Sequence, residues 1–312
     1  MRRVWMAMVG GSLLAAGCAP QMETALPTPS LPPAATAAPA AATTATSTPL
    51  PSATPQPTPT EEVKSVTFTI VYDNNAPVGA RDYDPALRAA WGFACLVETG
   101  EATVLFDTGG DGLTLLGNMD KLGLDPREID VVVLSHAHGD HTGGLAGLLD
   151  AGARPTVYAP AAFPASFKDS VRARTELVEV SAPLEILSGV HTTGEVGSGI
   201  VEQALVVETA DGADKQHPLV VLTGCAHPGV VEMVRRAKES VGGEVYLVMG
   251  GFHLGSASRQ QIATIVEDFQ QLGVQRVAPC HCSGDAAREL FEEAYGEAFI
   301  WAGVGSTLEI GK

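Results

Sequence analysis

The stretch SHAHGDHTGG, residues 135–144, holds three histidines and one aspartate in six consecutive positions, in a chain with eight histidines among 312 residues. It follows the apolar run VVVL, which is typical of a buried β-strand. On extended backbone the side chains of His136 and His138 project the same way, so both can reach one cation. The glycine that follows lets the chain turn sharply, and Asp140 and His141 can then face a second cation. We therefore expect a metal-binding loop at a strand end.

The composition limits the class of protein. The chain is 45% hydrophobic and 18% charged, and its length suits one large domain with appendages. It has 19 lysines and arginines against 36 acidic residues, a formal net charge of −17. Such a charge repels phosphate backbones, so we expect no nucleic-acid partner and predict a small-molecule substrate instead. The sequence does not indicate an oligomeric state.

The N-terminus has the pattern of a targeting segment. A basic start, MRR, precedes the thirteen-residue apolar run VWMAMVGGSLLAA, which ends in AAGC at Cys18. Thirteen residues are few for a membrane span, and the pattern resembles a bacterial lipoprotein signal. We expect residues 1–18 to be a signal peptide that ends at Cys18, with this cysteine lipidated. The protein would then be an extracytoplasmic lipoprotein that contacts the membrane through its lipid anchor only. The alternative is an ordinary secretory signal and a secreted protein.

The rest of the chain divides into a linker and a domain. Residues 19–62 are almost all proline, alanine, threonine and serine, which predicts a disordered stalk. Residues 63–312 alternate strand and helix patterns, which predicts a mixed α/β layer domain. The predicted strands are 65–74, 92–99, 102–109, 129–136, 155–160, 202–209, 219–227, 244–253 and 276–282. The predicted helices are 143–152, 229–241 and 258–273.

The pattern S-H-x-H-x-D-H-x-G-G after a hydrophobic strand resembles the signature of the metallo-β-lactamase fold superfamily. Seven further motifs occur in the order seen in its 7,8-dihydropterin-synthase-like branch: DNN, GFACLVE, LFDTGG, LTGCAHPGVV, GGFHL, APCHCSG and GVGS. The resemblance covers residues 65–310. It implies a four-layer αββα sandwich with metal-dependent chemistry at one edge of the paired sheets.

The resemblance also implies a set of site residues. Asp107, in LFDTGG, would support the histidine loop from behind. Two divalent metals commonly need six ligands, and His227 and His281 are the best candidates to complete the set because each follows a strand. The expected metal ligands are His136, His138, Asp140, His141, His227 and His281. The cofactor is expected to be two zinc ions, with manganese, iron or magnesium as alternatives.

Two positions are left open. Cys225 stands where other members of the superfamily have an aspartate that bridges both metals. It could bind metal as a thiolate, it could lie buried beside the site, or His227 could take over the coordination, which we favour. His253, in GGFHL, is expected to contact substrate or donate a proton, and a purely structural role is the alternative. Cys280 and Cys282, on either side of His281, could indicate a zinc or redox site, but packing is the interpretation that we favour.

The expected activity follows from paired cations. Two divalent metals can hold a hydroxide and polarise a carbonyl or phosphoryl oxygen, so the predicted enzyme is a metallo-hydrolase. Its expected substrate is a phosphoester or a related small polar ester, attacked by a metal-bound hydroxide that Asp140 orients. One alternative is a non-catalytic extracytoplasmic lipoprotein that binds metal or ligand. A second is a transferase of the dihydropterin-synthase type, against which export of the protein argues.

Overall fold

The computed structural model describes residues 65–76, 87–209 and 218–311. These described residues all belong to one compact unit. The predicted lipidation site Cys18, the signal peptide and the linker 19–62 lie outside the described residues. Within the described ranges, no helix is both long enough and apolar enough to cross a membrane.

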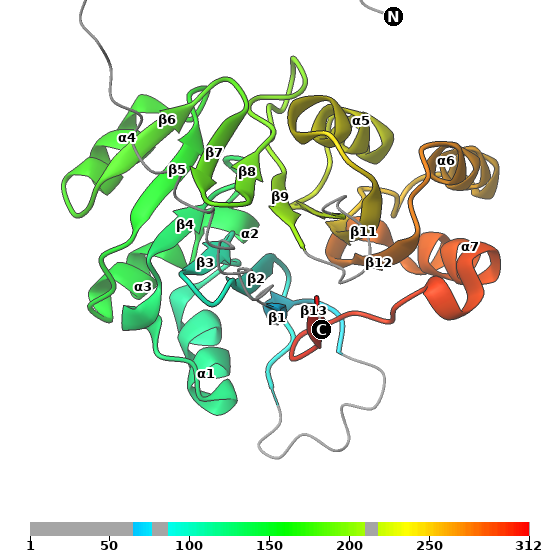
Figure 1. Ribbon diagram of the computed structural model, residues 1–312. Coiled ribbons are helices and arrows are strands. Elements are labelled where there is room, and N and C mark those ends of the chain that lie inside the picture. Colours follow the sequence, from blue (N-terminus) through cyan, green and yellow to red (C-terminus); the bar gives the residue numbers. More distant parts are fainter. Residues whose placement is uncertain (1–64, 77–86, 210–217, 312) are drawn as a thin grey trace, which may run out of the picture. The chain divides into compact units, whose positions relative to one another are not determined.

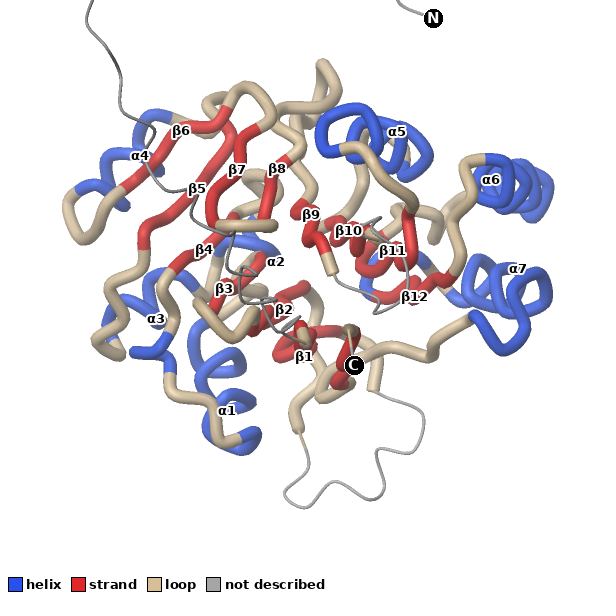
Figure 2. Tube along the Cα trace, viewed as in Figure 1, coloured by secondary structure: helices blue, strands red, loops and turns tan. Residues whose placement is uncertain are grey.

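The described chain is built around two β-sheets (Figures 1 and 2). The first sheet has the strand order β13-β1-β2-β3-β4-β5-β6, and the second has the order β12-β11-β10-β9-β8-β7. The strands of the first sheet are β1 (Val66–Asp73), β2 (Phe93–Glu98), β3 (Thr103–Phe106), β4 (Val131–Val133), β5 (Thr156–Pro160), β6 (Leu177–Val180) and β13 (Thr307–Ile310). The strands of the second are β7 (Leu184–Leu187), β8 (Val190–Thr192), β9 (Leu205–Glu208), β10 (Leu219–Thr223), β11 (Val245–Gly251) and β12 (Arg276–Cys280).

Helices cover the outer faces of both sheets, which makes four layers. Apolar side chains of β1–β4 pack between the sheets against those of β9–β12. The first sheet buries its other face under α1 and α3, and the second under α5, α6 and α7. The helices are α1 (Gly112–Leu122), α2 (Gly139–Thr142), α3 (Leu145–Asp150), α4 (Ala165–Arg172), α5 (Val230–Val241), α6 (Arg259–Gln271) and α7 (Asp285–Tyr295). Three short 3-10 helices are η2 (Pro126–Glu128), η3 (His281–Ser283) and η4 (Gly296–Ala298). The predicted αββα sandwich is therefore confirmed.

Strand direction places the metal-type residues at one edge of the sandwich. In the first sheet β3 pairs with β4 in parallel, so Asp107 and the loop from Ser135 follow adjacent strand ends. In the second sheet β10, β11 and β12 are all parallel, so the segments that follow them also meet at one edge. The carboxyl ends of parallel strands are the usual position of an active site in α/β proteins.

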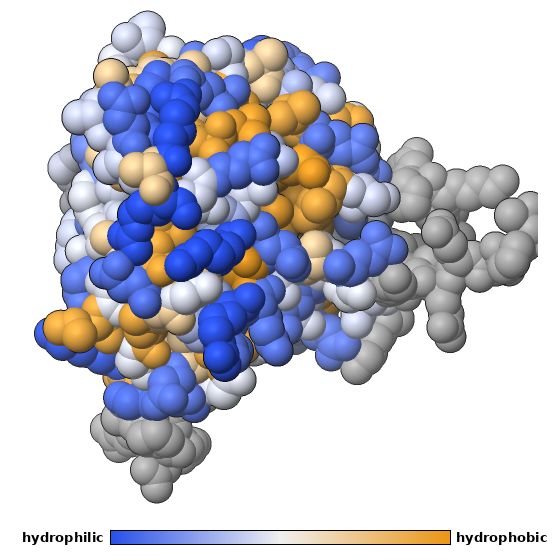
Figure 3. Space-filling view, turned by 90° about the vertical axis from the view of Figure 1, so that its left-hand side faces the viewer, coloured by the Kyte–Doolittle hydropathy of each residue, from blue (hydrophilic) through white to orange (hydrophobic). Residues whose placement is uncertain are grey.

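Every predicted strand and helix has a counterpart, but eight helices and strands were not predicted: α1, α2, α4, α7, β6, β7, β8 and β13. Several of these elements bury few side chains. In β7 none of the four residues is fully buried, and in β13 exposed and half-buried residues alternate. Helix α4 buries only Val171. Hydrophilic residues are prominent on the face of the molecule that carries α4 (Figure 3), as expected for a helix with one anchoring side chain.

Candidate metal centre

Three histidines form the first group of candidate ligands, which we name subsite A. The Nε2 atom of His136 lies 3.1 Å from Nδ1 of His138 and 3.2 Å from Nε2 of His227. Two nitrogen ligands of a tetrahedral zinc ion are separated by about 3.4 Å, because each Zn–N bond is about 2.1 Å long. The three rings are thus already spaced for one cation. His136 is buried, whereas His138 is exposed and opens the subsite to solvent.

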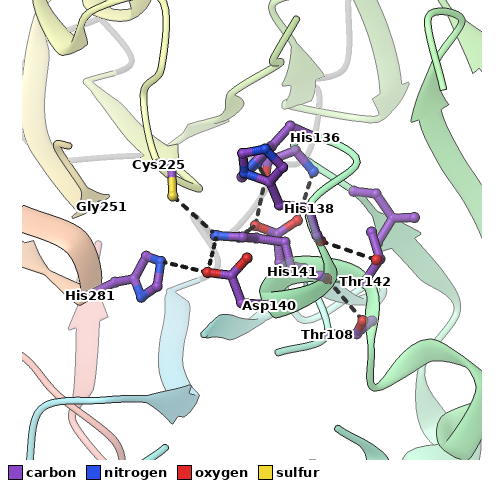
Figure 4. Close-up of polar contacts among 12 residues, drawn as sticks. Thr108, His136, His138, Asp140, His141, Thr142, Cys225, Gly251 and His281 are labelled. Carbon is purple, nitrogen blue, oxygen red and sulfur yellow. Dashed lines mark hydrogen bonds and ion pairs between the residues drawn. The ribbon is translucent and has the colours of Figure 1, made fainter. Parts of the chain in front are cut away.

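Asp140, His141 and His281 form a second group, subsite B (Figure 4). Asp140 Oδ2 lies 3.7 Å from His141 Nε2 and 3.5 Å from His281 Nε2, distances that suit ligands of a shared cation better than hydrogen bonds. His281 Nε2 is buried and has no hydrogen-bond partner among the described residues. A buried imidazole nitrogen without a partner is costly unless it binds something. The donor atoms of subsite B therefore fit a divalent cation.

One carboxylate orients two of these histidines. Asp107 is fully buried, and its Oδ2 accepts a hydrogen bond from His141 Nδ1 at 2.7 Å. The same oxygen accepts from Ser135 Oγ at 2.7 Å, and this hydroxyl lies 2.9 Å from His136 Nδ1. With Nδ1 protonated on both rings, each Nε2 lone pair faces the candidate cations. Gly224 gives this network its space, since a Cβ there would lie 2.1 Å from Ser135 Oγ.

A second buried carboxylate shapes the turn after β10. Glu202 Oε1 accepts hydrogen bonds from the backbone N–H groups of Cys225, at 2.9 Å, and Ala226, at 2.8 Å. Its Oε2 accepts from the N–H of His227 at 3.0 Å. Ala226 has a left-handed backbone with a φ of 60°, a conformation unusual for alanine. Glu202 thus holds the strained turn that aims Cys225 and His227 into the site.

His281 has its own support on the opposite side. Its Nδ1 lies 2.8 Å from Asn74 Oδ1, and its backbone N–H donates to the buried Asp73 Oδ2 at 3.1 Å. The ring of Trp91 lies against it, with the ring centres 5.0 Å apart, and the Trp91 side chain is 61% exposed. An exposed indole therefore forms part of the rim of the site.

The electrostatics favour the metal-binding forms of three ligands, neutral His136 and His227 and ionised Asp140. Burial and the neighbouring histidines lower the pKa of His136 far below its usual range, and burial and His253 lower that of His227 to about 4. Burial alone would lower the pKa of His141, but the Asp107 carboxylate raises it. Burial opposes ionisation of Asp140, yet His281 and His141 lower its pKa overall. Burial raises the pKa of Glu202, and the hydrogen bonds from its three N–H donors only partly offset this effect.

Two thiols lie beside the histidines. Cys225 Sγ is 3.2 Å from His141 Nε2, a contact drawn as a dashed line in Figure 4, and it is 3.4 Å from Cys282 Sγ. Their mutual hydrogen bond lowers the pKa of Cys282 to about 5, and together with burial it raises the pKa of Cys225. His253 is exposed, and its ring centre lies 4.3 Å from that of His227.

All the site residues predicted within the described ranges are brought together at this edge. His227 joins subsite A, and Cys225 lies at the junction of the subsites, with Sγ within 4.8 Å of ligand atoms of both His136 and His141. The interpretation of both flanking cysteines as packing residues fits Cys280, which is buried in the core, but Cys282 contacts the site. Sequence reasoning missed Glu202, Asp73 and Asn74. The DNN motif at the end of a strand could have indicated Asp73 and Asn74 as site residues. No pattern in the sequence around Glu202 indicates its role.

Comparison with known proteins gives the family. The profile described as the Metallo-beta-lactamase superfamily matches residues 92–237. A 7,8-dihydropterin-6-methyl-4-(beta-D-ribofuranosyl)-aminobenzene-5'-phosphate synthase from Methanocaldococcus jannaschii is 30% identical over 236 residues, which cover 63% of this chain and 80% of the relative. The structure of a metal-dependent hydrolase of the beta-lactamase superfamily is 27% identical with a TM-score of 0.62, over 79% of this chain and 100% of the other. A diphosphatase from the PhnP family shares the fold at 16% identity and a TM-score of 0.53, over 80% and 98% of the two chains. The chain belongs to the metallo-beta-lactamase superfamily.

Proposed function

We propose that the protein is a metal-dependent hydrolase that uses two adjacent divalent cations to cleave a phosphoester or a related small polar ester. The observation that carries the proposal is the pair of adjacent subsites, to which residues 136–141 contribute four of the six ligands, with a buried His281 Nε2 that makes no hydrogen bond within the described chain and faces Asp140. The donors of subsites A and B are five imidazoles and one carboxylate. Such a nitrogen-rich set favours zinc over magnesium or calcium.

Bound cations at these positions would lower the pKa of a water molecule and polarise the phosphoryl or carbonyl oxygen of the substrate. The protein supplies the orientation. Asp140 stays ionised at neutral pH because its pKa is lowered, so it can accept a hydrogen bond from the attacking water. Asp107 holds His141, and through Ser135 also His136, with Nε2 toward the site. Trp91 offers an exposed ring beside His281 for contact with the substrate.

The test combines metal analysis with a panel of substrates. The full chain is expected to hold two equivalents of zinc in subsites A and B and to hydrolyse a phosphodiester or phosphomonoester in a panel that also contains a lactone and a β-lactam. Asp140→Ala should abolish turnover and reduce bound metal. Asp150→Ala is the matched control, because this exposed carboxylate pairs with Arg174 outside the two subsites. Full activity in Asp140→Ala would refute the mechanism.

Two alternatives give different results in the same assays. A non-catalytic binding protein would hold metal in full stoichiometry and turn over no member of the panel. A transferase of the dihydropterin-synthase type is favoured by the 30% identity to the methanogen synthase, and it would act on a pterin precursor instead. Against it we propose that the protein works outside the cytoplasm as a lipoprotein, because MRR, the apolar run and AAGC at Cys18 form an export signal.

A further inference from the structure

We propose that Cys225, His253 and Cys282 form a third cation subsite, sulfur-rich and specific for a thiophilic ion such as Zn²⁺, beside subsites A and B. We name it the sulfur subsite. The sequence left the roles of Cys225 and His253 open, and it favoured a packing role for Cys282. The inference rests on the geometry of these three side chains and does not need the proposed hydrolysis to be correct.

The backbone brings the three residues together in a defined way. Cys225 follows β10, His253 follows β11 and Cys282 follows β12, and these strands are consecutive, parallel neighbours in the second sheet. Parallel pairing aligns the three strand ends, with Thr223 opposite Gly250 and Gly251 opposite Cys280. Ligands on the ends of paired strands are held more rigidly than ligands on a free loop.

Backbone strain marks the same turns. His253 has a φ of 54°, and Ala226, next to Cys225, has a φ of 60°. The left-handed region costs energy for any residue with a Cβ, so it persists where the surrounding structure imposes it, often at functional sites. Gly251 also fits this picture, because a Cβ there would lie 2.8 Å from Cys282 Sγ. Glycine at this position leaves room for the sulfur.

The distances suit coordination. The two Sγ atoms and one ring nitrogen of His253 all lie within 4.8 Å of one another, and the sulfurs are 3.4 Å apart. Two thiolates on a tetrahedral zinc ion are separated by about 3.8 Å, because each Zn–S bond is about 2.3 Å long. A small movement of one side chain would bring the pair to that spacing. Both cysteines are free thiols.

Donor type and access indicate which cation fits. Two thiolates and an imidazole select zinc, or its analogues cobalt and cadmium, over magnesium, calcium and manganese. Cys225 is buried, Cys282 is half-buried and His253 is exposed, so a cation can enter from solvent and keep an open coordination position. Because Cys225 Sγ also lies 3.2 Å from His141 Nε2, its thiolate is placed to bridge the sulfur subsite and subsite B. This assignment makes His253 a ligand rather than a proton donor.

The experiment is a titration of the metal-free full chain with Co²⁺ under reducing, anaerobic conditions. Thiolate ligation gives an intense near-ultraviolet charge-transfer band that nitrogen and oxygen ligands do not give. We expect this band in the wild type, with a third equivalent of bound cation. Cys282→Ser should lose roughly half or more of its intensity, since one of two thiolate ligands is removed. His253→Ala should weaken cobalt binding at this step about tenfold or more.

Controls separate this inference from folding and from the proposed function. Cys95→Ala removes a thiol that is buried between the sheets and should leave the band unchanged. His191→Ala removes a histidine that pairs with Glu208 and should leave cobalt affinity unchanged. Asp140→Ala should keep the band even where hydrolysis is lost. An unchanged band in Cys282→Ser, no band in the wild type, or a Cys225–Cys282 disulfide that persists under these conditions would each overturn the proposal.

Discussion

Glu202→Gln probes how the turn after β10 is held. The carboxylate is fully buried and accepts three backbone hydrogen bonds at 2.8–3.0 Å, one of them from the N–H of the candidate ligand His227. Glutamine has nearly the same shape but only one acceptor oxygen. If that oxygen faces Cys225 and Ala226, the amide NH₂ faces the N–H of His227, and two donors meet.

The expected cost follows from these contacts. Two charge-assisted bonds become neutral ones, at a loss of roughly 1 kcal/mol each, and one buried N–H is left without an acceptor at about 1–3 kcal/mol. Removing a buried charge regains part of its desolvation cost, in line with the raised pKa of Glu202. The net loss of unfolding free energy is therefore about 2–3 kcal/mol, a large share of the roughly 5–15 kcal/mol that stabilises a typical domain. Relaxation of the turn should also move His227 and weaken metal binding in subsite A.

Urea unfolding of the metal-free full chain measures the first effect, and zinc retention during dialysis against a weak chelator measures the second. The matched control is Glu195→Gln, because Glu195 Oε1 accepts one backbone hydrogen bond, from Ala162 at the surface. That variant should lose less than about 1 kcal/mol. The reasoning is refuted if Glu202→Gln unfolds at the same urea concentration as the wild type, with the same slope, and retains zinc equally well.

Three further results are expected. Cys18→Ser should move the protein from the membrane fraction to the soluble fraction; unchanged fractionation without lipid labelling would contradict a lipid anchor. Asp107→Asn should reduce zinc affinity about 10–100-fold in chelator competition, because the amide cannot hold His141 Nδ1–H as the carboxylate does; wild-type affinity would exclude that role. The pKa of His227 is lowered from 6.5 to about 4, so the unfolded chain binds more protons in that window, and the metal-free protein should lose stability as pH falls through it. His227→Gln should flatten this dependence of Tm on pH, and an identical pH profile would argue against it.

The histidine-rich loop 135–144 and the main strands could be predicted because their information is local. His136, His138, Asp140 and His141 are neighbours in sequence, so backbone geometry alone puts them within reach of shared cations. The buried strands are short runs of apolar residues, and such a run predicts a buried strand whatever its position in the sheet. Elements that bury few side chains, such as β7 and α4, lack this signal and were missed.

The sulfur subsite and the support of the turn depended on contacts between residues far apart in sequence. Cys225 and Cys282 are separated by 57 positions, and they meet because β10 and β12 run parallel on either side of β11. Glu202 is 25 positions from His227, and nothing near it in the sequence shows that its carboxylate is buried against three N–H groups. Strand order and direction arise from the packing of the whole sandwich, and no local pattern of residues encodes them.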